Sequence, residues 1–384
     1  MKRYLFLPFI MVLMSLSVAS ATERYEIERE LPLYFEQLRQ ELQYPDAWGN
    51  SEMTDYNEWR EYARDILLQR LQYTPDDTPY DYRVIATEQR AGYKAHRIEL
   101  NINRYVRVPA YLLVPDGEGE HPAVVLLHDH GAKFDIGKEK NIRPFAADTV
   151  TLAIANAWVD KCYDGIYTGD YLAQNGYVVL AIDALFWGER GRKEGSRYDS
   201  QQALSANLLQ LGRSWCGMIV SDDMRSVDFL ASLPFVDSER IGAVGFSMGA
   251  YRAWMLSAAT DGVKAAAAVC WMCVTDSLMT LSNNQTKGGS AYAMIVPGLR
   301  NHLDYQHVAS ISCPKPMLFI NGKRDKLFPI GGVEEAYAYM HNVWDECDAD
   351  DSLVTTLYDT PHTFNRAMHT EVLQFLDRWL KGSK

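Results

Sequence analysis

The sequence is poor in the features that mark several specialised protein classes. Six cysteines among 384 residues are too few for a disulfide scaffold, and internal repeats and low-complexity tracts are lacking. Acidic residues outnumber basic ones, 50 to 38, and the resulting net charge of −12 repels phosphate backbones. Nucleic acid is therefore not expected as a partner. Beyond the first 21 residues no uninterrupted apolar run reaches about 18 residues, so we expect no membrane span in the mature chain.

The first 21 residues have the pattern of an export signal. A basic start, Met1-Lys2-Arg3, precedes a mostly apolar stretch from Tyr4 to Met14, and small residues follow up to Ala19-Ser20-Ala21. The apolar stretch is too short to span a bilayer comfortably, whereas its length suits the apolar core of a signal peptide. We therefore expect residues 1–21 to be removed and the mature protein to be periplasmic or secreted.

Residues 22–80 have helical periodicity. Apolar residues recur at helical spacing in two segments, and an Asp55-x-x-Glu58 capping box precedes the second of them. These positions are Leu31, Phe35, Leu38, Leu42, Trp59, Ala63, Ile66, Leu67 and Leu71. We expect an N-terminal helical extension over residues 22–80, packed as a cap on a catalytic domain of residues 81–384.

Strands alternate with helices through the rest of the chain, which predicts an α/β fold. Several strands are apolar at every position, as expected for parallel strands buried on both faces. The expected strands span residues 96–100, 108–114, 123–127, 177–182, 241–245, 265–272, 316–320 and 353–357. Such a pattern indicates a mostly parallel central sheet with helices on both faces. Ligands of these sheets bind at the carboxyl ends of the strands.

The segment Gly245-Phe246-Ser247-Met248-Gly249 is a G-x-S-x-G motif between a predicted strand and a predicted helix. A turn this tight needs small residues on both sides, and it projects the Ser hydroxyl over the sheet edge at a helix N-terminus. The context predicts that Ser247 is a nucleophile. An ordinary serine in a glycine-rich turn is the alternative.

A neutral serine needs a base and an orienting acid, which follow in the order acid, then histidine. His362 lies in the loop between the last strand and the last helix, whereas His369 lies inside that helix. A loop at the carboxyl end of a strand can reach the serine, so we predict His362 as the base. Asp325 follows the strand 316–320 and is the predicted acid; Asp276, after the preceding strand, is the alternative.

Two backbone N–H groups should stabilise the oxyanion. One is expected from Met248, the residue after the nucleophile, and the other from the loop after strand 123–127, either at His130 or at Gly131. The pair His128-x-His130 has a rival interpretation, because two histidines on one strand face can bind zinc. Further ligands in matching contexts are not found, so we expect no metal.

Cys270 and Cys273 form a C-x-x-C pair. A redox motif places its first cysteine at a helix N-terminus, but Cys270 lies near the end of an apolar run that is predicted as a buried strand. We therefore expect both residues to be buried thiols.

Together these residues resemble the α/β-hydrolase superfamily, and within it the dienelactone-hydrolase and acetyl-xylan-esterase-like branch of secreted bacterial esterases. The matching stretches are residues 124–131, 176–190, 240–249, 314–329 and 361–364. The resemblance implies an α/β-hydrolase fold and a serine-dependent carboxylic-ester hydrolase that acts without a cofactor, often on acyl groups linked to carbohydrate.

Two departures from related families bear on the substrate. Dienelactone hydrolases carry Cys where this chain has Ser247, and glucuronoyl esterases carry Arg where it has Met248. Both differences favour ordinary acyl esters, while a uronate methyl ester stays open as an alternative.

Long segments after two predicted strands, residues 132–170 and 274–312, are expected to roof the pocket over the serine. Trp187, Trp271 and Tyr292 are candidate pocket aromatics, with core packing as the alternative for each. A small-molecule or oligosaccharide ester is the expected substrate.

Two other functions compete with ester hydrolysis. The Asp-x-x-Arg-Ile-Gly segment before the G-x-S-x-G motif also resembles prolyl-oligopeptidase-type domains, although the first 95 residues leave no room for a β-propeller. A binding protein that has lost catalysis is a different class, and the presence of a serine, an acid and a histidine in the expected order argues against it.

Overall fold

The computed structural model describes residues 32–192, 194–280 and 292–382. The predicted signal peptide therefore lies outside the described residues. The chain divides into two compact units, residues 1–42 and residues 43–384. Within its described part, the first unit contains helix α2 (Pro32–Gln40). Among the described helices, none combines the length and the apolar character needed to cross a bilayer.

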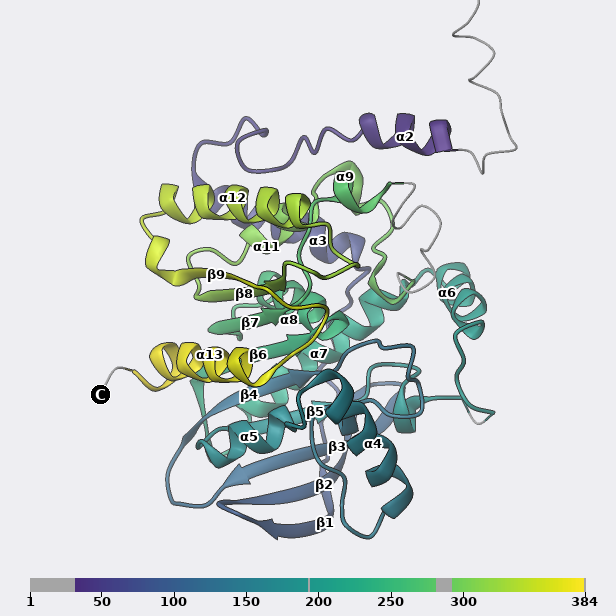
Figure 1. Ribbon diagram of the computed structural model, residues 1–384, viewed down its shortest axis with the longest axis vertical. Helices are drawn as coiled ribbons and strands as arrows, with labels where there is room; N and C mark the ends of the chain where they lie inside the picture. Colours follow the sequence, from purple (N-terminus) through teal and green to yellow (C-terminus); the bar gives the residue numbers. More distant parts are fainter. Residues whose placement is uncertain (1–31, 193, 281–291, 383–384) are drawn as a thin grey trace, which may run out of the picture. The chain divides into compact units, whose positions relative to one another are not determined.

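The second unit is built on a sheet whose described strands run in the order β1-β2-β3-β5-β4-β6-β7-β8-β9 (Figure 1). The strands from β5 across to β9 are parallel to one another, and β1, β2 and β3 join them as antiparallel strands at one side. Their bounds are Arg83–Arg90, Tyr93–Asn103, Val106–Pro115, His121–Leu127, Val178–Ile182, Val236–Phe246, Ala265–Val269, Met317–Gly322 and Leu353–Tyr358 for β1 to β9. The predicted mostly parallel α/β architecture is confirmed.

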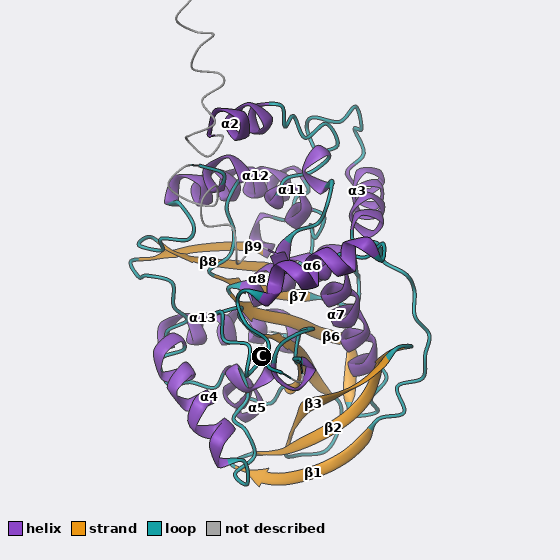
Figure 2. Ribbon diagram, turned by 90° about the vertical axis from the view of Figure 1, so that its right-hand side faces the viewer, coloured by secondary structure: helices purple, strands orange, loops and turns teal. Residues whose placement is uncertain are grey.

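Helices cover both faces of the sheet (Figure 2). One face carries α3 (Tyr56–Arg70), α7 (Trp215–Ala231), α8 (Met248–Ala259), α11 (Tyr305–Ser310) and α12 (Ile330–Glu346). The opposite face carries α4 (Thr149–Cys162), α5 (Thr168–Gln174) and α13 (Arg366–Leu376). The remaining described helices are α6 (Ser200–Gln210), α9 (Thr275–Leu278), η3 (Lys138–Lys140), η4 (Gly188–Arg190), η6 (Leu299–Asn301), η7 (Asp350–Ser352) and η8 (Asp377–Lys381).

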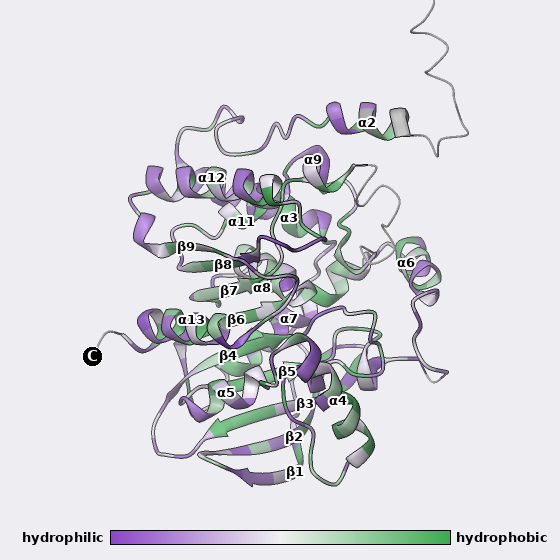
Figure 3. Cartoon of the chain, viewed as in Figure 1, coloured by the Kyte–Doolittle hydropathy of each residue, from purple (hydrophilic) through white to green (hydrophobic). Residues whose placement is uncertain are grey.

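The central strand β4 shows why the sheet needs helices on both sides. Its side chains alternate in direction, and Val125 and Leu127 enter one core cluster while Val124 and Leu126 enter the other. Both sets are almost fully buried, so the strand is apolar at every position. Figure 3 shows the same contrast across the sheet, because β3 is mostly hydrophobic whereas the outer strand β1 is largely hydrophilic.

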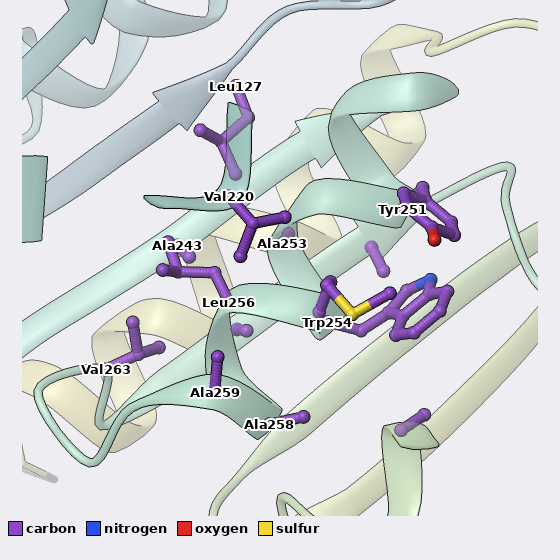
Figure 4. Packing of buried hydrophobic residues seen from close by; sticks show 14 of the residues in the cluster. Leu127, Val220, Ala243, Tyr251, Ala253, Trp254, Leu256, Ala258, Ala259 and Val263 are labelled. Carbon is purple, nitrogen blue, oxygen red and sulfur yellow. The ribbon is translucent and has the colours of Figure 1, made fainter. Parts of the chain in front are cut away.

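Helix α8 is the most deeply buried helix of the site region. Every one of its residues is buried, and Ala253 and Leu256 lie beside Val220 of α7 and Ala243 of β6 (Figure 4). The helix starts immediately after β6, and its N-terminus lies at the carboxyl edge of the parallel strands. The loops that leave β4, β6, β7, β8 and β9 meet at this same edge.

Candidate active site

The turn between β6 and α8 holds Ser247 in an unusual backbone conformation, with φ 57° and ψ −121°. Its flanking glycines are required by close approach of the backbone. A Cβ on Gly249 would lie 1.9 Å from the carbonyl oxygen of Leu127, and a Cβ on Gly245 would lie 2.1 Å from the carbonyl oxygen of Gly249. No side chain fits at either position. The G-x-S-x-G motif therefore has the tight strand-to-helix geometry that the sequence predicts.

Three predicted residues lie together at the carboxyl edge of the sheet. Nε2 of His362 lies 2.9 Å from Oγ of Ser247, and Nδ1 of His362 lies 2.6 Å from Oδ2 of Asp325. Because a carboxylate can only accept hydrogen bonds, Nδ1 is the donor to Asp325. In the neutral imidazole, Nε2 then carries the lone pair and faces the serine hydroxyl. This arrangement suits the removal of a proton from Ser247.

The Asp325 carboxylate is enclosed, whereas His362 is accessible. The Asp325 side chain has no exposed surface, and its second oxygen, Oδ1, accepts a hydrogen bond of 2.9 Å from the N–H of Leu327. The His362 side chain is 23% exposed. The alternative acid Asp276 lies at the start of α9 and is exposed, and the histidine bonds to Asp325.

The predicted oxyanion donors are backbone N–H groups with no acceptor among the described residues. Met248 is the first residue of α8, where an N–H has no partner within the helix. The N–H groups of His130 and Gly131 likewise make no hydrogen bond to any part of the chain that the structure describes. The structure leaves both of these residues open as the second donor.

His128 and His130 have both ring nitrogens engaged. His128 accepts a hydrogen bond at Nε2 from the N–H of Ala184 and donates from Nδ1 to the carbonyl of Asp129. His130 accepts at Nδ1 from the N–H of Ala132, and its Nε2 lies 2.9 Å from Oε1 of Gln201. Burial lowers the pKa of His130 to about 4 and that of His128 well below its ordinary value. Both rings are therefore neutral, and neither offers a free lone pair to a metal ion.

Two clusters among the described residues have the spacing of metal ligands, and neither contains these histidines. One consists of Cys270 with Asp325 and His362. The other consists of Glu139, Asp183 and Glu189. The ammonium of Lys138 lies 2.7 to 2.9 Å from an oxygen of each of these three carboxylates, so a cation of the protein itself occupies their centre. Burial opposes the charge on Lys138, but the carboxylates outweigh it and raise its pKa.

The three candidate pocket aromatics differ in burial. Trp187 is completely buried, packs among His130, Phe134 and Trp215, and donates from Nε1 to the carbonyl of His130 at 3.2 Å. Direct contact of Trp187 with a substrate would need a rearrangement. Trp271 is 5% exposed, whereas Tyr292 is only partly buried.

Cys270 and Cys273 are both buried and carry free thiols, as the sequence predicts. Burial raises the pKa of Cys273 to about 12, and that of the Cys270 thiol is raised as well. The strand β7 ends at Val269, one residue before Cys270, which has φ 60°. The Cys270 thiol donates to the carbonyl of Thr363 in the loop of His362.

Sequence reasoning missed three residues that support the site. Lys138 and Lys140 begin and end the short helix η3, and both side chains are completely buried. Gln201 at the start of α6 contacts His130. No motif identifies them, because most of their partners are backbone carbonyls or side chains distant in the sequence.

The chain is similar in sequence to known proteins. The model of the Abhydrolase family matches residues 34–351. A candidate hydrolase of Bacillus subtilis (strain 168), YtaP, is 28% identical over 322 residues, which cover 84% of this chain and 100% of that protein.

Solved structures share the fold. The crystal structure of a candidate acetyl xylan esterase from Bacteroides fragilis NCTC 9343 matches with a TM-score of 0.68 and 17% identity, covering 85% of this chain and 81% of that one. A glucuronoyl esterase from Solibacter usitatus matches with a TM-score of 0.59 and 13% identity, covering 86% and 95%. The predicted resemblance to the α/β-hydrolase superfamily is confirmed by the family match, and these solved structures share its fold.

Proposed function

The chain belongs to the Abhydrolase family, and from that premise we propose that it is a serine-dependent carboxylic-ester hydrolase that removes acetyl or other acyl groups from carbohydrate. The observation that carries the proposal is the continuous hydrogen-bonded chain from Oγ of Ser247 through His362 to the enclosed carboxylate of Asp325. Ser247 is the proposed nucleophile, His362 the base and Asp325 the orienting acid.

In the first half of the reaction, Nε2 of His362 takes the hydroxyl proton as Oγ of Ser247 attacks the ester carbonyl. The carbonyl oxygen becomes an oxyanion, which the N–H of Met248 and that of His130 or Gly131 stabilise. Collapse of the tetrahedral intermediate breaks the bond to the alcohol, and the protonated His362 donates its proton to the departing alkoxide. The products are the free alcohol and an acyl group on Ser247.

In the second half, water replaces the alcohol. His362 removes a proton from the water, hydroxide attacks the acyl carbonyl, and the same N–H groups stabilise the second oxyanion. The bond to Oγ then breaks, the proton returns to Ser247, and the carboxylic acid leaves. Every proton is accepted and returned by His362, so the scheme needs no metal ion and no cofactor.

A carbohydrate ester as the substrate is supported by similar folds. The solved structures that match include an esterase named for acetyl xylan and one named for glucuronoyl esters. The two differ in which side of the ester bond carries the sugar, because an acetyl group is the acid part whereas a uronate ester places the sugar on the acid part. The residue after the serine is Met248, which favours an acetyl or other acyl ester over a uronate ester.

The proposal is tested with the Ser247→Ala variant and a substrate panel. Because the hydroxyl is the attacking group, we expect kcat on an aryl acetate to fall by about 10⁴-fold while the fold is unchanged. The panel contains an acetylated xylo-oligosaccharide, a methyl ester of a uronic acid and a short peptide. Ser247→Ala activity above a tenth of the wild-type value would reject the nucleophile, and cleavage of the peptide alone would reject the esterase.

We also propose that residues 1–21 are a signal peptide, that residues 22–80 cap a catalytic domain of residues 81–384, and that the protein is exported. The mass of the mature protein tests the cleavage. A chain isolated with Met1 to Ala21 still attached would contradict it.

A further inference from the structure

A buried ammonium lies directly behind the loop that follows β4. Lys140 ends the short helix η3, and its side chain has no exposed surface. Its Nζ donates hydrogen bonds of 2.8 Å to the carbonyl of Asp129 and 3.0 Å to the carbonyl of His130. A third neighbour, Oδ1 of Asp129, lies 3.5 Å away. All three donors of the ammonium therefore have an acceptor nearby, and two of these are consecutive backbone carbonyls.

These two carbonyls fix the direction of the neighbouring N–H groups. In a planar trans peptide, C=O and N–H point in opposite directions. The carbonyl of Asp129 shares its peptide with the N–H of His130, and the carbonyl of His130 shares its peptide with the N–H of Gly131. An ammonium that holds both carbonyls on one side turns both N–H groups to the other side. These are the two candidate donors, and neither has an acceptor within the described ranges of the chain.

Other contacts hold the same loop from several directions. Oδ2 of Asp129 accepts hydrogen bonds from Nε1 of Trp158 and from the hydroxyl of Tyr163, at 3.1 and 2.7 Å. Nε1 of Trp187 donates to the carbonyl of His130. Lys140 itself lies over the Trp158 ring, 5.4 Å from its centre. The ammonium is therefore held between the loop and Trp158, and its hydrogen bonds go to the loop and not to Ser247.

We propose that Lys140 is a positioning residue that aims the N–H groups of His130 and Gly131 at the oxyanion formed on Ser247. The inference rests on the proposed function, because it assigns a role within that reaction. The hydrogen bonds of Lys140 go to the loop carbonyls and not to Ser247, His362 or Asp325. It acts through the two peptide groups, whose orientation before the reaction decides how strongly they bind the developing negative charge.

Stability alone gives no reason for a lysine here. Moving an ammonium from water into the protein interior is costly, and an apolar side chain of similar length would often be as stable or more so. Burial lowers the pKa of Lys140 even though Asp129 is close. The cost of burying Lys140 is explained by its bonds to two adjacent carbonyls, because these carbonyls set the direction of the neighbouring N–H groups.

The experiment compares Lys140→Met with the matched control Lys315→Met. Lys315 is also largely buried and donates from Nζ to two backbone carbonyls, those of Ser257 and Thr260, at the far end of α8. Both variants replace an amine that bonds two carbonyls with an apolar side chain of similar length, so their changes in stability should be comparable. Only Lys140 faces the loop after β4.

The readouts are the rate at which a fluorophosphonate labels Ser247, and kcat and KM on an aryl acetate. We expect Lys140→Met to lower the labelling rate and kcat by about 100-fold with KM changed less than threefold, because one aligned donor is worth that much in the transition state. Lys315→Met should stay within threefold of wild type. Lys140→Met labelling within threefold of Lys315→Met would overturn the inference.

Failure of the proposed function would give a different result from failure of the inference about Lys140. If wild type hydrolyses no ester, or Ser247→Ala keeps its activity, the function is wrong whatever Lys140 does. If Lys140→Met does not fold, the crystal structure of fluorophosphonate-labelled wild type decides. We expect the phosphonyl oxygen within 3.2 Å of the nitrogen of Met248 and of that of His130 or Gly131. A phosphonyl oxygen that contacts neither of the last two would overturn the inference.

Discussion

Ser247 combines an unfavourable backbone conformation with the position predicted for chemistry. A side-chain-bearing residue at φ 57° and ψ −121° carries a conformational cost of roughly 1–3 kcal/mol. Two hydrogen bonds keep it there, from its N–H to the carbonyl of Val269 at 2.8 Å and from the N–H of Tyr251 to its carbonyl at 3.1 Å. The fixed backbone places the hydroxyl 2.9 Å from Nε2 of His362, so little reorientation is needed before attack.

The role of Asp325 as the orienting acid can be tested by replacing one carboxylate oxygen with an amide nitrogen. Asp325→Asn keeps the shape of the side chain, but its amide cannot stabilise the charged imidazole and can reverse the histidine tautomer. We expect kcat on an aryl acetate to fall by about 10³-fold or more. Asp276→Asn is the control and should change kcat less than threefold. If Asp276→Asn is the damaging variant, the acid follows β7 and not β8.

The parts of the site that could be predicted from sequence are those with a local signature. Ser247 has a motif, and Asp325 and His362 each follow a recognisable strand in the expected order. Lys140 and Gln201 have no such signature. Lys140 bonds backbone carbonyls, which every residue type provides, and Gln201 contacts a histidine 71 positions away. Such contacts depend on how loops fold over each other, and no local pattern in a single sequence indicates that arrangement.

At the scale of elements, prediction succeeded where both faces of a strand are buried. The strands around residues 123–127, 177–182 and 316–320 are found close to their expected bounds, as β4, β5 and β8. Strand β1 was not predicted, because seven of its eight residues are not buried and its pattern is hydrophilic. An outer strand of this kind is specified by pairing with β2 and not by its own apolar residues.

The segment 132–170, predicted as one long loop, contains η3, α4 and the start of α5. In α4 only Ala155 and Val159 are buried, so its apolar residues do not form the stripe that periodicity detects. One local signal was present. Asp148 caps the helix by accepting a hydrogen bond from the N–H of Thr151.

The role of the loop after β4 in binding the oxyanion can be tested with a substitution at Gly131. Gly131 has φ 56°, and a Cβ there would lie 2.2 Å from a ring carbon of Trp158. Gly131→Ala must therefore move Trp158 or the loop. We expect fluorophosphonate labelling of Ser247 to slow at least tenfold, because a displaced oxyanion donor loses part of the roughly 100-fold that an aligned one contributes.

The matched control is Gly92→Ala in the turn between β1 and β2. Gly92 has φ 85°, and a Cβ there would meet nothing within 4 Å. Both variants bear the cost of a side chain at positive φ, roughly 1 kcal/mol or more, but only one meets a clash. Gly92→Ala should therefore lose stability and keep the wild-type labelling rate. Equal labelling rates in the two variants would show that the loop tolerates the displaced tryptophan.

At the scale of the whole unit of residues 43–384, one sheet separates two apolar cores. Helix α3 contributes Trp59, Ala63 and Leu67 to the larger of them, together with α8 and α12. The predicted cap and the sheet thus share a core over part of the region, and the boundary at residue 80 stays a prediction. The pattern of alternating elements was enough to predict the fold class, because it depends on burial averaged over many residues. Domain limits depend on fewer contacts and leave a weaker trace in the sequence.

The same extensive burial predicts how stability depends on pH. His307 and His369 are almost completely buried in addition to the two histidines of the site loop, and burial lowers the pKa of His130, His307 and His369 to about 4. In the unfolded chain a histidine titrates near 6.5. Between these values the unfolded chain binds protons that the folded protein does not. The contribution of these histidines to the free energy of unfolding is therefore fully present above about pH 6.5, and it falls as the pH drops towards about 4.

His369 isolates one of these contributions. Its Nε2 lies 3.0 Å from Oγ1 of Thr168, its Nδ1 lies 2.9 Å from the carbonyl of Asn365, and its ring stacks on Phe364.

His369→Gln replaces this histidine with a side chain that does not titrate. Urea unfolding at about pH 7.5 and pH 5.0 then gives two losses of stability. We expect the loss in wild type to exceed that in His369→Gln by about 2 kcal/mol, which is the part that one pKa moved from 6.5 to about 4 contributes between these two pH values. The variant is expected to be less stable than wild type at pH 7.5, so the comparison uses the difference between the two pH values within each protein. Equal losses in both proteins would mean that His369 is protonated without unfolding.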